Sequence, residues 1–202
     1  MMSTIPDKFE QILDAAIESI AESGYHQCTV AKIATRAGVA TGTIYLYFKN
    51  KEEVLIRVFQ ERMGVFTSGI RRKLQESDDT KTQLRTIISS HFEYMEQNRS
   101  LAIVTQIELR QSDPVVRKAI SEPLRAYLDL IEEVIREGIS RGEVTAPNVR
   151  VARQMIFGAL EQATTDWVWA DKNKKLSSEV EPLMFLLEGA LRLRQVQLET
   201  NA

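Results

Sequence analysis

The chain has a single cysteine, Cys28, among its 202 residues, so no disulfide bond can form within it. A chain without disulfides fits a reducing cytosol. No apolar run reaches the roughly 18 residues that are needed to span a bilayer. The first residues, MMSTIPDKFEQ, lack the basic segment and apolar core of a signal peptide. These absences predict a cytoplasmic protein without a membrane segment.

The sequence also lacks a general excess of positive charge, since its net charge is -2. Any contact with nucleic acid must therefore be local. One stretch from Gly24 to Lys51, GYHQCTVAKIATRAGVATGTIYLYFKNK, contains no Asp or Glu but several bases. DNA repels carboxylates on a docking surface, because its phosphates are negative. The stretch is therefore a candidate DNA-binding surface, and the alternative is a solvated helical hairpin that lacks acids by chance.

Strands are missing from the expected structure, because no segment alternates convincingly between apolar and polar residues. Apolar residues recur instead at helical spacing, which predicts an all-α fold of about nine helices. The main expected boundaries are an end at Gly24, starts at Asn50, Pro114 and Pro147–Asn148, a kink or restart at Pro123, and a last helix over 177–195.

Residues 30–47 have the spacing of a helix-turn-helix. Ala34 is small enough for the point where two helices cross, and Gly38 can adopt the positive φ of a tight turn. Thr29 is placed to cap the first helix. The second helix, at about 40–46, exposes Thr41, Thr43 and Tyr45, whose hydroxyls and ring can reach base edges or phosphates in a major groove. Five apolar residues are expected to face inward: Ile33, Ala37, Val39, Ile44 and Tyr47.

The stretch TVAKIATRAGVATGTIYLYFKNKEEVL, residues 29–55, resembles the DNA-binding domain of TetR-family transcriptional repressors. The resemblance implies a homodimer that binds a palindromic operator. It also implies a three-helix DNA-binding domain, residues 1–48, and a helical effector-binding and dimerisation domain, residues 49–202. Carried over by position, the family's DNA contacts are Thr29, Thr41, Gly42, Thr43, Tyr45, Tyr47 and Lys51, to which Lys32 and Lys49 are added.

Two later stretches, LAIVTQIELRQSD (101–113) and VRVARQMIFGALEQATTDWV (149–168), resemble the fatty-acid-degradation regulators of Bacillus-type bacteria. This resemblance implies an operator complex that is released by long-chain acyl-CoA. The alternatives are a TetR-type repressor that answers a drug-like or other lipophilic ligand and a ligand-free architectural DNA-binding protein. The architectural alternative leaves some 140 residues of apolar-striped helix without a purpose.

The effector pocket implied by the resemblance needs an apolar lining and a cation for phosphate. The same apolar residues would also form an ordinary core, so the sequence does not separate the two roles. Arg110 and Arg153 are the preferred phosphate ligands, and Glu108 and Glu161 are their alternative partners. The full candidate set is Phe92, Met95, Ile103, Ile107, Arg110, Tyr127, Leu130, Arg153, Met155, Phe157 and Leu160.

The last two long helices carry more apolar surface than a monomer easily hides, and the resemblance places the dimer contact there. The alternative is that these helices pack within one chain. The predicted interface residues are Trp167, Leu183, Met184, Leu187, Ala190 and Leu191.

No catalytic motif is evident in the sequence. It has no glycine-rich phosphate loop and no nucleophile elbow, so we expect neither an enzyme nor a cofactor. His91 lies on an apolar stripe without a second ligand at metal-binding spacing, which favours a hydrogen-bonded core histidine. Cys28 is expected to be an inert thiol.

Overall fold

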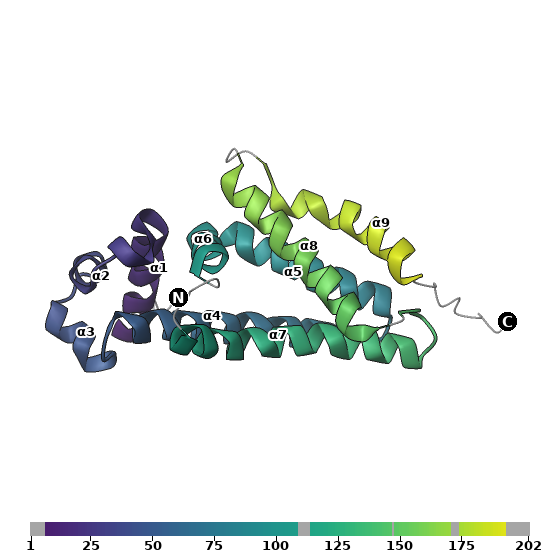
Figure 1. Cartoon of the computed structure of the whole chain (residues 1–202), viewed down its shortest axis with the longest axis horizontal. Helices are drawn as coiled ribbons and strands as arrows, with labels where there is room; N and C mark the ends of the chain where they lie inside the picture. The colour runs from purple at the N-terminus through teal and green to yellow at the C-terminus, as the bar shows by residue number, and fades with distance from the viewer. Residues whose placement is uncertain (1–6, 109–113, 147, 171–173, 193–202) are drawn as a thin grey trace, which may run out of the picture. The chain divides into compact units, whose positions relative to one another are not determined.

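The computed structural model describes residues 7–108, 114–146, 148–170 and 174–192. These residues form nine α-helices and one short 3-10 helix and contain no strand, which confirms the predicted all-α fold (Figure 1). The helices are α1 Lys8–Gln27, α2 Val30–Ala37, α3 Thr41–Tyr47, α4 Lys51–Leu74, α5 Thr80–Gln97, α6 Arg99–Glu108, α7 Pro114–Ser140, α8 Val149–Trp169, η1 Leu176–Glu179 and α9 Val180–Leu191.

Two of the predicted helix starts are capped by asparagine side chains. Asn50 Oδ1 accepts a hydrogen bond from Glu53 N at 2.8 Å, and the Glu53 carboxylate accepts one from Lys49 N at 2.6 Å. Asn148 Oδ1 accepts from Val151 N at 3.1 Å at the start of α8. These bonds satisfy amide groups that a helix start otherwise leaves without partners.

Two predicted boundaries differ from the structure, and one of two alternatives is excluded at a third. Gly24 has a φ of 74° and interrupts α1, but one more turn follows before the helix ends at Gln27. At Pro123, where a kink or a restart is expected, α7 continues without restarting. The last helix is shorter than predicted, because residues 176–179 form the separate 3-10 helix η1.

The chain divides into two compact units. The first comprises residues 1–64 and 98–123, and the second comprises residues 65–97 and 124–202. In the first unit, α1 packs against α2 and α6. Arg62 on α4 binds two carboxylates of α1, Glu10 at 2.8 Å and Asp14 at 2.7 Å. The core of the first unit includes Ile12, Leu13, Ala16, Ile33, Ile44, Leu55 and Phe59.

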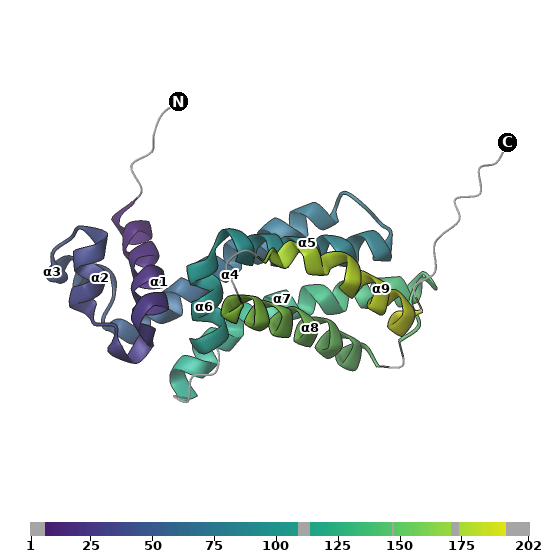
Figure 2. The ribbon, with the colours of Figure 1, turned by 90° about the horizontal axis from the view of Figure 1, so that it is seen from above.

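In the second unit α5, α8, α9 and η1 pack together, and α8 and α9 lie side by side (Figure 2). The end of α7 is fixed to the start of α5 by the carboxylate of Glu143. This carboxylate accepts hydrogen bonds from Thr80 N at 3.0 Å and from Arg141 Nε at 2.8 Å, which lower the Glu143 pKa although burial alone would raise it. The core of this unit includes Leu84, Ile87, Phe92, Leu130, Ile135, Ile156, Leu160, Met184 and Leu187.

Candidate DNA-reading surface and sensor core

The turn between α2 and α3 has the geometry that the sequence predicts. Gly38 adopts a left-handed conformation, with φ 66° and ψ 30°. Its N–H donates to Thr35 O at 3.2 Å, and Val39 N donates to Ala34 O at 3.0 Å. Glycine adopts this conformation without the steric cost that a Cβ atom adds. The turn therefore fixes the direction in which α3 leaves α2.

The helix α3 presents a continuous exposed surface. Tyr45 is 55% exposed and Leu46 is 83% exposed, whereas Ile44 is buried and holds the helix to the unit. Leu46 was not among the predicted contacts, because an apolar residue at a helix end is ordinarily assigned to a core. An exposed aliphatic side chain on a reading helix can contact a thymine methyl group. The structure also places the predicted residues Thr41 and Gly42 on this surface, with Thr43 half-buried beside them.

Tyr47 has a structural contact as well as an exposed ring. Its ring lies 6.3 Å from that of Phe9, and the Phe9 ring stacks on Phe48 at 5.4 Å. Tyr47 is nevertheless 40% exposed. Phe9 of α1 therefore supports the end of α3, a role that its apolar position in the sequence does not reveal.

Lys51 has a position that sequence spacing did not indicate. Its ammonium donates to Tyr25 O at 2.9 Å, to Cys28 O at 3.0 Å and to His26 O at 3.5 Å, and it lies 4.3 Å from the centre of the Tyr25 ring. These carbonyls belong to the last turn of α1 and to its C-cap residue Cys28, where a cation is favoured. An ammonium has three N–H donors, and these three carbonyls already use them. Any contribution of Lys51 to DNA binding would therefore come chiefly from its charge.

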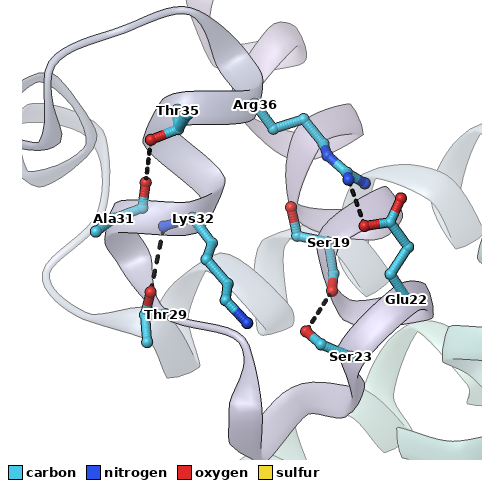
Figure 3. Close-up of a pocket in the computed structure, with 8 residues that line it drawn as sticks. All are labelled: Ser19, Glu22, Ser23, Thr29, Ala31, Lys32, Thr35 and Arg36. Carbon is cyan, nitrogen blue, oxygen red and sulfur yellow. Dashed lines mark hydrogen bonds and ion pairs between the residues drawn. The ribbon is translucent and has the colours of Figure 1, made fainter.

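Lys32 and Arg36 of α2 line a hollow of about 470 Å³ together with residues of α1 (Figure 3). Thr29 caps α2 by accepting from Lys32 N at 3.2 Å, and the exposed Lys32 ammonium contacts Gln27 O at 3.4 Å. Arg36 forms an ion pair with Glu22 of α1, which raises the pKa of the guanidinium. Part of the positive charge in the acid-free stretch is therefore neutralised from outside it. Lys49 is exposed at the end of α3.

A chain of three polar side chains crosses the core of the second unit. His91 Nδ1 lies 3.2 Å from Tyr127 Oη, and His91 Nε2 lies 3.3 Å from Thr164 Oγ1. Thr164 donates its hydroxyl proton to Leu160 O at 2.8 Å, so its oxygen must accept from His91. His91 therefore carries its proton on Nε2, and Tyr127 donates to Nδ1. We call this set the buried polar chain.

Burial controls the protonation of the buried polar chain. Desolvation lowers the pKa of His91 to about 3 and raises that of Tyr127 above its usual value. The rings of Phe66 and Phe92 lie edge-on to His91, at 5.8 and 5.9 Å between centres. His91 is thus a neutral, hydrogen-bonded core residue, as its place on an apolar stripe predicts.

Because His91 is buried in its neutral form, the protein should lose stability in acid. Above pH 6.5 His91 is neutral whether the chain is folded or unfolded, but between 6.5 and about 3 only the unfolded chain binds the proton. The free energy of unfolding therefore falls by about 1.4 kcal/mol per pH unit in this range. Urea unfolding at pH 7 and at pH 5 would measure this fall. Between the two pH values, the free energy of unfolding should fall by about 2 kcal/mol less for His91→Gln than for the wild type. The exposed His26→Gln is the matched control, and equal losses in all three proteins would contradict this account.

Five of the eleven predicted effector residues lie in the core of the second unit. Phe92, Met95, Tyr127, Leu130 and Leu160 are buried there. Phe157 is half-buried with its ring 6.2 Å from that of Tyr127, and Met155 is exposed on α8. Ile103 is half-buried in the first unit, while the side chain of Ile107 and all of Arg110 fall outside the described residues.

Arg153, a predicted phosphate ligand, already has an acidic partner. Its Nε lies 3.2 Å from Glu132 Oε1 on α7, an ion-pair distance without the alignment of a hydrogen bond. Glu132 also binds Arg136 one turn along the same helix, at 3.1 Å. The expected alternative partners did not include Glu132, because residues on different helices give no spacing signal. A phosphate at Arg153 would have to compete with this carboxylate.

The predicted interface residues are mostly covered within one chain. Trp167, Met184, Leu187 and Leu191 are buried, and the Trp167 Nε1–H donates to Lys174 O at 2.7 Å. Leu183 is half-buried and Ala190 is exposed. The exposed apolar face of α8 and α9 consists instead of Val151, Met155, Trp169, Phe185 and Leu186.

Among the described residues no helix combines the length and apolarity that crossing a membrane requires. The same residues contain no group of three or more His, Cys, Asp or Glu side chains placed to hold a metal ion. The buried Cys28 thiol has a raised pKa because of desolvation, so little reactive thiolate forms at neutral pH.

Comparison with known proteins covers both halves of the chain. Residues 12–58 match the model of bacterial regulatory proteins of the tetR family, and residues 59–190 match that of the C-terminal region of YsiA-like proteins. The chain is 47% identical over 185 residues to the fatty acid metabolism regulator protein of Bacillus subtilis, which covers 91% of this chain and 95% of that protein. The chain belongs to the TetR family. It is accordingly a transcription regulator and not an enzyme.

Two solved TetR-family structures resemble this one along nearly their whole length. The fatty acid degradation regulator FadR from Bacillus halodurans has a TM-score of 0.89 at 47% identity, over 95% of this chain and 100% of that one. FadR from Bacillus subtilis in complex with stearoyl-CoA has a TM-score of 0.85 at 47% identity, over 89% of this chain and 97% of that one.

Removal of the Lys51 ammonium should destabilise the first unit of this TetR-family protein, which contains the turn between α2 and α3. Lys51→Met keeps the aliphatic stem but leaves the carbonyls of Tyr25 and Cys28 without their donor. Hydrogen bonds from charged groups contribute about 1.5–3 kcal/mol, and part of that should be recovered by water. Thermal unfolding should therefore show a lower midpoint for Lys51→Met than for Lys49→Met, a matched change at an exposed position. Equal midpoints would contradict a stabilising role for the Lys51 ammonium.

Proposed function

We propose that this protein is a homodimeric repressor of fatty-acid degradation genes that leaves a palindromic operator when a long-chain acyl-CoA binds. The observation that carries the proposal is the 47% identity, over nearly the full length, to FadR of Bacillus subtilis, whose structure holds stearoyl-CoA. Its place of action would be the cytoplasm, where operator DNA and acyl-CoA are both present.

In this proposal residues 1–48 read DNA. The helix α3 would enter the major groove with Thr41, Thr43 and Tyr45 toward the bases, supported by exposed Leu46. Gly42 would allow close approach of the backbone, while Thr29, Lys32, Tyr47, Lys49 and Lys51 would contact or attract phosphates. A helix of seven residues reads few base pairs, so two copies on an inverted repeat would supply the specificity.

Residues 49–202 would bind the effector and form the dimer. The acyl chain would enter among the buried side chains of α5, α7 and α8, which include Phe92, Tyr127, Leu130 and Leu160. It releases DNA only if it binds the DNA-incompetent arrangement more tightly than the competent one. The long helix α4, Lys51–Leu74, begins directly after the reading helix and is the covalent route between the two functions.

Thermal stabilisation would test the effector class. A ligand that binds only the native protein at a hundred times its dissociation constant stabilises it by about 2.7 kcal/mol. We expect stearoyl-CoA to raise the unfolding midpoint and coenzyme A without an acyl chain to have little effect. Stabilisation by a drug-like lipophilic compound, with none by any acyl-CoA, would replace this effector and leave the repressor function standing.

A further inference from the structure

A groove of about 280 Å³ lies between α4 and α5 in the second unit. Its residues recur every three or four positions, so each helix contributes one face. The groove is apolar along most of its α4 side and becomes cationic toward the end of that helix. Its lining includes Phe66, Arg72 and Lys73 from α4 and Ser90, Glu93 and Tyr94 from α5.

The cationic end of the groove consists of Arg72 and Lys73. Lys73 Nζ donates to Ser90 Oγ across the groove at 3.1 Å, and Arg72 has no ion pair within the described part of the chain. The preceding residue, Arg71, instead binds Glu133 at 2.8 Å. Bases in the last turn of a helix complement its dipole, which accounts for all three residues. The dipole does not account for two of them lining a groove beside aromatic rings.

The floor of the groove is continuous with the buried polar chain. The ring of Phe66 stacks on that of Tyr94, with centres 4.8 Å apart and planes at 28°. The same Phe66 ring lies 5.8 Å from the ring of His91 and 5.1 Å from that of Tyr127. Phe66 therefore contacts the groove on one side and the proposed acyl-binding core on the other.

We propose that this groove binds the nucleotide end of the acyl-CoA effector, an inference that rests on the proposed function. Arg72 and Lys73 donate to the phosphates, since their guanidinium and ammonium groups match phosphate oxygens. The adenine lies against Tyr94, and the Glu93 carboxylate accepts from its amino group. The acyl chain passes Phe66 into the core.

This placement also explains why Arg153 is a weaker candidate for the phosphates. Arg153 is held by Glu132 and is half-buried, so a phosphate must displace a carboxylate that lies 3.2 Å away. Arg72 and Lys73 are exposed, and neither is paired with an acid within the described residues. A dianionic phosphate at the groove therefore adds charge pairs without breaking an existing one.

The test compares stearoyl-CoA with stearic acid on the wild type and on the double variant Arg72→Ala/Lys73→Ala. Each lost charge-assisted contact should weaken binding roughly tenfold or more. We expect the dissociation constant for stearoyl-CoA to rise roughly a hundredfold in the double variant, measured by titration below the micelle concentration. The dissociation constant for stearic acid should change less than threefold, since the acid has no nucleotide.

Arg71→Ala is the matched control, because it removes a neighbouring base that faces Glu133 instead of the groove. Tyr94→Leu should also weaken stearoyl-CoA more than stearic acid, and Tyr94→Phe should not. All four positions are exposed or half-buried, so circular dichroism should show folded variants. The inference is overturned if the double variant binds stearoyl-CoA as the wild type does, or loses both ligands equally. A wild type that binds no acyl-CoA overturns the proposed function as well.

Discussion

Replacing Phe185 with Glu should produce a folded monomer that has lost most of its operator affinity. Phe185 is 78% exposed on α9 and Leu186 is 66% exposed beside it, so a charge at Phe185 costs the isolated chain little. In a two-fold dimer the same residue appears twice, and each buried charge without a partner costs about 2 kcal/mol or more. The dimer constant should therefore weaken by roughly a thousandfold. Sedimentation and operator binding at micromolar protein would measure both effects.

The controls for this prediction separate assembly from folding. Val115→Glu also places a charge on an exposed apolar position, 73% exposed on α7, and should leave the dimer intact. Leu187→Glu changes a residue only two positions further along α9, but its side chain is only 2% exposed. It should unfold the second unit instead of releasing a monomer. A Phe185→Glu protein that sediments as a dimer would place the interface elsewhere.

Lengthening the acyl chain from 12 to 18 carbons should strengthen effector binding by about three orders of magnitude. Each methylene transferred from water to an apolar core contributes about 0.8 kcal/mol, and six of them contribute about 5 kcal/mol. Affinity should rise steadily with chain length and level off once the cavity is full. Titration of the wild type with a series of acyl-CoAs, each below its micelle concentration, would measure the slope.

Coenzyme A without an acyl chain serves as the zero point of this series. If the nucleotide end dominated recognition, every member of the series would bind about equally well. That flat result would contradict the apolar core around Phe92, Tyr127 and Leu160 as the acyl site, whereas a rising slope supports it.

The helix-turn-helix in the first unit was largely predictable because its determinants are local. A small residue at position 34, a glycine at 38 and apolar residues at fixed offsets require the same turn wherever they occur. The structure has that turn, with Gly38 at a φ of 66°. The cap at Asn50 was equally local, since its partner Glu53 lies three residues away. Such features depend on spacing along one helix.

Features that join separate helices were not predictable. Lys51 reaches the carbonyls of Tyr25 and Cys28, more than 20 residues earlier, and Arg153 binds Glu132 on another helix. No spacing rule connects such positions. Which face of α9 is covered within one chain also depends on neighbouring helices. Leu187 and Phe185 are both apolar, and only the packing of neighbouring helices decides which one is buried.

Fluorescence anisotropy of a labelled operator tests the central claim most directly. The protein is first bound to an inverted-repeat operator at a concentration just above saturation, and stearoyl-CoA is then added below its micelle concentration. We predict that anisotropy returns to that of free DNA, with coenzyme A alone and stearic acid far less effective at the same concentration. An operator complex that persists at saturating stearoyl-CoA, with ligand binding shown independently, would contradict the account.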